Sequence, residues 1–178
     1  MKKIMIIVGI VIIYFFMYFL HVNFFDWFTI AGIKPNLFVL LVLFIGLYTG
    51  EKCGAISGFI IGLYTDFLFS NKIGGSAILL LIVGFAGGYL DKKFSKDEGK
   101  MTIIVMGIIA TAFYEVMFYI YNMIVLSVEF NIGSFLYILS IELLYNVLLI
   151  IILYPIINRL GCYAENIFKN KDISPRYF

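Results

Sequence analysis

Charged residues are scarce in this chain of 178 residues. Only 13% of its residues are charged, about half the share in an average soluble domain, whereas 63% are hydrophobic and the mean hydropathy is +1.04. The formal net charge of +2 gives no indication of nucleic-acid binding. The composition therefore excludes an ordinary soluble enzyme and predicts an all-α integral membrane protein.

Residues that usually carry chemistry are also few. The two cysteines, Cys53 and Cys162, form no CxxC motif, and the single histidine, His21, has no cysteine or histidine partner with the spacing of a metal site. A Ser/His/Asp set, a phosphate-binding P-loop and an HExxH motif are all missing. We therefore predict no catalytic, cofactor-binding or metal-binding residue, and a protein that is not an enzyme.

Long apolar runs make up most of the chain. Such a run must reach about 20 residues to cross about 30 Å of hydrocarbon as a helix. Only residues 51–53 separate the second run from the third, so these two are either short helices joined by a tight turn or one long broken helix. The chain reads as a single membrane domain, 1–178, with predicted spans at 4–22, 35–50, 54–70, 75–91, 101–128 and 134–158.

Lys and Arg placement predicts the orientation. Basic residues in short loops mark the cytoplasmic side of a membrane protein. With six spans and both termini in the cytoplasm, 11 of the 13 basic residues lie inside, and only Lys34 and Lys72 lie outside. After the last span, a polar tail is expected from Arg159 onwards, and the longest internal polar stretch, residues 91–100, becomes a cytoplasmic loop.

Glycines recur every four residues around the third span. Small residues at this spacing lie along one helix face and let another helix approach closely. The expected face serves either packing within the chain or the docking of a partner's transmembrane helix. The glycines concerned are Gly46, Gly50, Gly54, Gly58 and Gly62, followed in the fourth span by Gly84, Gly87 and Gly88.

Carboxyl groups inside the spans need an explanation, because a carboxylate costs roughly 2.5–3.5 kcal/mol in hydrocarbon on insertion scales. Glu115 and Asn122 share a face of the fifth span, and Glu142 and Asn146 share a face of the sixth. Counted from the predicted outer ends of the two helices, Asn122 and Glu142 lie at similar depth, and so do Glu115 and Asn146. The hypothesis is that the two helices are neighbours joined by carboxyl–amide hydrogen bonds, with a partner contact or a ligand site as the alternatives.

Asp66, at the outer end of the third span, is the other intramembrane acid. A polar cluster with Asn36 and His21 at that end is geometrically allowed.

The stretch 35–89 resembles the family of the rod shape-determining protein MreD. The likeness rests on Pro35-Asn36-Leu37 at the start of the second span and on a glycine-rich third span that ends in Gly-Leu-x-x-Asp at Asp66. A short loop containing Gly74 and a glycine-rich fourth span follow, as in the family. The resemblance makes these positions candidates for partner contact or packing: Pro35, Asn36, Gly50, Gly54, Gly58, Gly62, Asp66, Gly74, Gly84 and Gly88.

The resemblance implies a non-enzymatic role in the bacterial cytoplasmic membrane. MreD-like proteins act in the cell-elongation complex (the elongasome) with MreC and, through it, with MreB, RodA and a class B penicillin-binding protein, to direct lateral peptidoglycan synthesis and cell shape. The fold is similar in overall build to the six-helix S component of energy-coupling-factor vitamin transporters, which is the competing function. Against that alternative, the first span has Gly9 as its only small residue and lacks the alanines of the S-component docking pattern.

Overall fold

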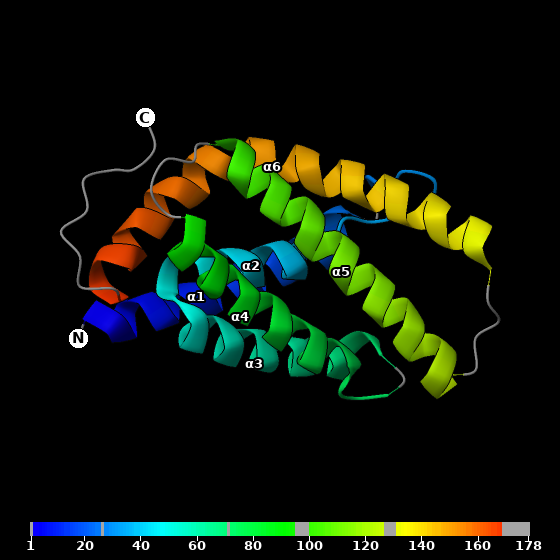
Figure 1. The fold of residues 1–178 in the computed structure, drawn as a ribbon, viewed down its shortest axis with the longest axis horizontal. Coiled ribbons are helices and arrows are strands. Elements are labelled where there is room, and N and C mark those ends of the chain that lie inside the picture. The colour runs from blue at the N-terminus through cyan, green and yellow to red at the C-terminus, as the bar shows by residue number, and fades with distance from the viewer. Residues whose placement is uncertain (1, 26, 71, 95–99, 127–130, 169–178) are drawn as a thin grey trace.

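In the computed structural model, residues 2–25, 27–70, 72–94, 100–126 and 131–168 are described, and within them the chain is helical with no β-strand. The predicted six helices are confirmed (Figure 1). A five-residue π-helical turn, η1 (Leu20–Phe24), extends the first helix. The helices are α1 (Lys2–Phe19), α2 (Leu37–Thr49), α3 (Glu51–Phe69), α4 (Gly75–Phe94), α5 (Lys100–Leu126) and α6 (Ile132–Phe168).

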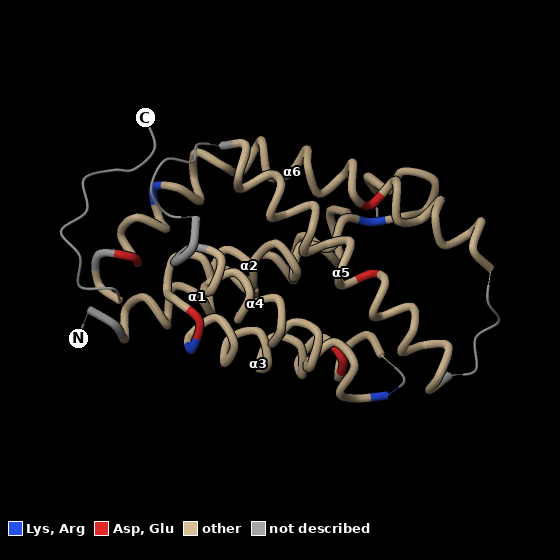
Figure 2. Tube along the Cα trace, viewed as in Figure 1, with Lys and Arg blue, Asp and Glu red and all other residues tan. Residues whose placement is uncertain are grey.

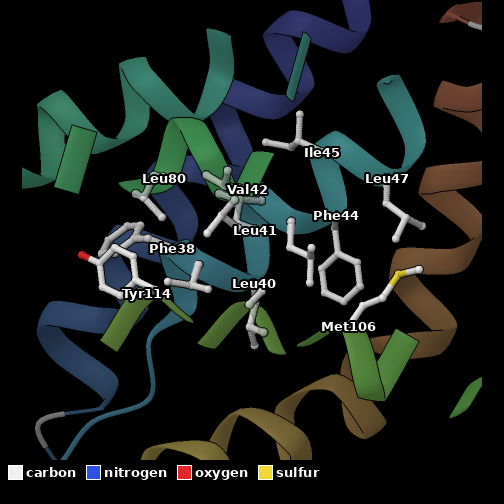
Figure 3. Close-up of a cluster of buried hydrophobic side chains, with 14 of the residues drawn as sticks. Phe38, Leu40, Leu41, Val42, Phe44, Ile45, Leu47, Leu80, Met106 and Tyr114 are labelled. Atoms are coloured by element: carbon white, nitrogen blue, oxygen red, sulfur yellow. The ribbon is translucent and has the colours of Figure 1, made fainter. Parts of the chain in front are cut away.

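Helix α2 is the centre of the bundle. All 13 of its residues are buried, and it packs against α1, α3, α4, α5 and α6. Its side chains point outwards in all directions into the core, with Leu80 of α4 and Met106 of α5 among their neighbours (Figure 3). A helix that is apolar on every side is one that other helices surround. The short second run of the sequence is therefore the core of the bundle rather than a peripheral span.

Two separate helices, α2 and α3, form a hairpin around Gly50. This residue has φ +94°, which a glycine adopts without strain, and it is the only residue between the two helices. The turn resolves the two alternatives for residues 51–53 in favour of short helices. It also corrects the expected single glycine face, because Gly46 lies on α2 and faces Gly54 on α3 across the hairpin.

Helix α6 continues ten residues beyond the span predicted to end at 158. It has 37 residues, about 55 Å at 1.5 Å per residue, with Pro155 inside it. The helix bends in its C-terminal part (Figure 1), as expected where a proline removes a backbone hydrogen bond. The predicted polar tail from Arg159 is thus helical as far as Phe168.

Four helices of the described chain are long and apolar enough to cross a membrane: Ile4–Phe24, Glu51–Phe69, Met101–Val125 and Ile132–Glu165. Helix α2 and the apolar part of α4, Gly75–Leu90, are shorter. The start of α1 and the end of α6 lie at one end of the bundle (Figure 1), and the described Lys and Arg residues lie towards both ends (Figure 2). Arg159 is in the C-terminal part of α6 and Lys52 in the first turn of α3, whereas Lys34 precedes α2 and Lys72 lies between α3 and α4. That arrangement agrees with the predicted orientation, and crossing by all six helices stays a prediction.

Candidate functional site

The glycines form a close-packed seam between α3 and α4. A Cβ atom added at Gly58 would lie 2.7 Å from the carbonyl carbon of Leu80, and one added at Gly62 would lie 2.5 Å from Cα of Ala77. A Cβ at Gly84 would likewise lie 2.6 Å from the carbonyl carbon of Gly54. Carbon atoms in ordinary contact are about 3.5–4.0 Å apart, so no side chain fits along this seam.

Helix α4 of the same chain covers the glycine face of α3 along this seam. Gly54, Gly58, Gly62, Gly84 and Gly88 are all buried. Of the two interpretations of the glycine pattern, the structure shows packing within the chain, and α4 occupies the place that a partner helix would take. A helix of another protein would therefore have to bind on another face.

Asp66 closes one end of this seam by binding the first turn of α4. Its carboxylate is fully buried and accepts hydrogen bonds from the backbone N–H groups of Gly74, Ser76 and Ala77 at 2.8, 3.1 and 3.2 Å. The hydroxyl of Ser70 donates a fourth at 3.3 Å. The N-terminus of a helix carries unpaired N–H groups and partial positive charge, so a carboxylate there is stabilised even at membrane depth.

Gly74 supplies the turn that this binding requires. Its φ is +119°, a conformation that disfavours any residue with a side chain. Ser76 then extends the contact to α5, because its hydroxyl accepts a hydrogen bond from the Tyr114 hydroxyl at 3.1 Å. The pair Ser76–Tyr114 was not predicted from the sequence. The only signal for it was that both residues are polar within apolar helices.

A second polar cluster lies where α2 begins and joins α2, α5 and α6. The side-chain amide of Asn36, the N-cap of α2, donates to Oε1 of Glu115 at 3.2 Å. The backbone N–H of Asn36 donates to Oδ1 of Asn146 at 3.1 Å, and Nδ2 of Asn146 donates to the hydroxyl of Thr111 at 3.0 Å. The side chains of Glu115 and Glu142 are also hydrogen-bonded to each other. We call these five residues the Asn36 cluster.

The Asn36 cluster revises the predicted pairing. The last two helices are neighbours, as predicted. However, Glu142 bonds to Glu115 rather than to Asn122, and Asn36 bridges Glu115 and Asn146.

The proposed cluster of Asp66, Asn36 and His21 does not form. Asp66 binds the start of α4 and Asn36 binds α5 and α6, whereas the His21 ring packs against Phe38 and Phe69 at centroid distances of 5.3 and 5.5 Å. Phe38 lies on α2 and Phe69 on α3, so the ring fills space between two helices. Pro35, another predicted position, is buried directly before the cap of α2.

Both polar clusters connect helices: Asp66 joins α3 to α4, and the Asn36 cluster joins α2, α5 and α6. In the described part of the chain, no group of three or more His, Cys, Asp or Glu side chains could hold a metal ion. Cys53 and Cys162 are not joined in a disulfide. The predicted cytoplasmic loop, 91–100, is helical at both ends, because α4 reaches Phe94 and α5 begins at Lys100, and its middle, residues 95–99, lies outside the described residues. The geometry thus supports fixed helix positions, with outward faces that are almost wholly apolar.

The fold and these clusters define a class: an all-helical, multi-pass membrane protein whose few buried polar groups hold its helices together. A family model described as rod shape-determining protein MreD matches residues 2–162 of the 178. The chain belongs to the MreD family and is therefore a rod-shape-determining membrane protein. No curated protein matches the chain. The search of solved structures finds no match either.

Proposed function

We propose that the protein is a non-enzymatic component of the cell-elongation complex in the bacterial cytoplasmic membrane. In this role it controls rod shape and lateral peptidoglycan synthesis by helix-to-helix contacts with MreC and, through MreC, acts with MreB, RodA and a class B penicillin-binding protein. The observation that carries the proposal is the match to the family over residues 2–162.

Helix-to-helix contact is the mode that the surface of the protein favours. Its outward faces on α1, α3, α5 and α6 expose large apolar side chains, which suit lipid or another transmembrane helix. Only 11% of the apolar stretch in Ile4–Phe24 is buried inside the protein, the lowest share among the four long helices. A partner helix therefore has the most free surface on α1.

Recovery of partners tests the proposal. Tagged protein is extracted from its native membrane in mild detergent, and the proteins that come with it are identified by mass spectrometry. MreC, with or without the wall synthases, is the expected result. A coupling protein with two ATPases would instead assign the chain to the S components of vitamin transporters and refute the proposal.

Tryptophan substitutions then map the partner surface. One exposed residue is changed on each outward face: Val8 on α1, Ile60 on α3, Ile109 on α5 and Leu148 on α6. All four variants should accumulate normally, because lipid accommodates a larger side chain. The substitution on the partner's face should reduce the recovery of MreC.

The seam supplies the opposite control. Gly58→Leu should lower the amount of protein as well as partner recovery, because its side chain meets the backbone of α4. If Gly58→Leu left the protein level normal and removed only MreC, the glycine face would be a partner surface after all.

A further inference from the structure

The exposed apolar face of α6 does not end with its membrane span. Along this helix, Leu144, Leu148 and Ile152 recur every four residues, and each is more than half exposed. The series continues past Pro155 with Ile156, Leu160 and Tyr163, which are exposed to a similar degree. We call the last three residues the α6 stripe. It continues the face with which the span meets lipid.

The opposite face of the same segment is packed against the bundle. Gly161 is buried, and a Cβ added there would lie 2.5 Å from Cδ2 of Tyr48, near the end of α2. The Tyr48 hydroxyl donates to Oδ1 of Asn158 at 3.5 Å, and Glu165 is only 3% exposed. The segment is therefore held in place, and the α6 stripe points away from the contact with α2.

Length places the segment at the edge of the membrane. The part of α6 from Ile132 to Tyr154 is about 35 Å long, enough to cross about 30 Å of hydrocarbon. Beyond it α6 contains Pro155 and bends in its C-terminal part (Figure 1). Arg159 lies on this part of α6, and Lys52 lies in the first turn of α3, which follows the end of α2 that Gly161 contacts. Arg159 is exposed and adjoins Leu160 of the stripe.

We propose that the end of α6, from Ile156 to Phe168, is a membrane-interface helix whose stripe lies in the cytoplasmic leaflet. A helix with an apolar stripe and a basic residue beside it lies at the boundary between headgroups and acyl chains, with its apolar side chains about 5–10 Å deep. Tyrosine is favoured at this level, and Arg159 suits the anionic phosphates. The lipid surface thus holds this segment from outside while Tyr48 holds it from inside.

Spin labels test where the stripe lies. In a background with Cys53 and Cys162 changed to alanine, single labels are placed through Leu160→Cys, Ile152→Cys and Lys52→Cys. The protein is reconstituted alone into vesicles of phosphatidylethanolamine and phosphatidylglycerol. Collision of each label with oxygen, which prefers lipid, is compared with collision with a water-soluble nickel chelate. Ile152 is the control for the lipid-facing span, and Lys52 is the control for the aqueous side.

The oxygen-to-nickel ratio at position 160 should match that at 152 and exceed that at 52. A ratio at 160 equal to that at 52 would place the stripe in water and overturn the proposal. Protection from both reagents, with a strongly immobilised label, would mean that a second copy covers the stripe, and this too would overturn it. Leu160 is exposed, so the label itself should leave the fold intact, which size-exclusion chromatography checks.

Discussion

Replacing Gly58 with alanine probes the helix seam with a single added methyl group. The new Cβ would collide with the Leu80 carbonyl and would lie 2.7 Å from its carbon atom and 3.0 Å from Cγ1 of Val42. Ordinary carbon contacts begin about 1 Å further away, so α4 has to move. The obstacle is helix backbone, which shifts as a whole, and this puts the cost at the upper end of the overpacking range, about 3 kcal/mol.

Helix propensity offsets part of that cost. Alanine in place of glycine inside a helix contributes about 1 kcal/mol, so Gly58→Ala should lower the free energy of unfolding by about 2 kcal/mol. That is roughly a thirty-fold change in the unfolding equilibrium. Gly9→Ala is the matched control, since nothing lies within 4 Å of a Cβ at that position. It should stabilise the protein by up to about 1 kcal/mol.

Unfolding in mixed micelles of dodecyl maltoside and increasing SDS, followed by pulse proteolysis, measures both variants against the unsubstituted protein. Equal midpoints for Gly58→Ala and Gly9→Ala would refute the close packing of α3 on α4. Gly62→Ala places its methyl group against Cα of Ala77. If Gly58→Ala lowered the stability and Gly62→Ala did not, the seam would be tight at one point only.

The same assay checks three further predictions. Asp66→Asn should lower the free energy of unfolding by about 1.5–3 kcal/mol, because the uncharged amide replaces a carboxylate that accepts four hydrogen bonds. Ser70→Ala, which removes only one of these bonds, should lower it by about 1 kcal/mol. Similar losses for both variants would contradict the role of Asp66 as the anchor of α4. Asn36→Ala should cost about 1–3 kcal/mol, because the partly buried carboxyl of Glu115 loses a donor and the first turn of α2 loses its cap. Asn122→Ala should have little effect, so an equal loss at both positions would argue against the Asn36 cluster. Gly161→Leu should cost about 1–3 kcal/mol of stability, because the new side chain meets the Tyr48 ring. Leu160→Ala should change the stability by less than about 0.5 kcal/mol. No loss of stability in Gly161→Leu would mean that the end of α6 is not packed on α2.

Features that depend on one stretch of chain were predictable. The six helices follow from the length of the apolar runs, while the orientation, taken from where Lys and Arg interrupt them, stays a prediction. The order of Pro35, Asn36, the glycines and Asp66 was enough to suggest the family that the comparison shows. The importance of Asn36 was indicated as well, although its partners were not.

Spacing along one helix does not identify the helix that packs against it. Glycines four residues apart predict close approach equally well for α4 and for a partner, and only the turn at Gly50 divides the series between two helices. The same limit explains the missed bond between Glu115 and Glu142, since equal depth on two helices leaves their rotation and the intervening Asn36 unspecified.

By itself the sequence determined an all-helical membrane protein and its family, and it predicted an orientation, because hydrophobic length and charge position are properties of single segments. The tertiary structure decided that the shortest helix is the core, that the glycine face is filled from within, and that α6 continues past Pro155 onto Tyr48. These features depend on which surfaces meet. Contacts between residues distant in the chain are fixed only when all six helices pack together.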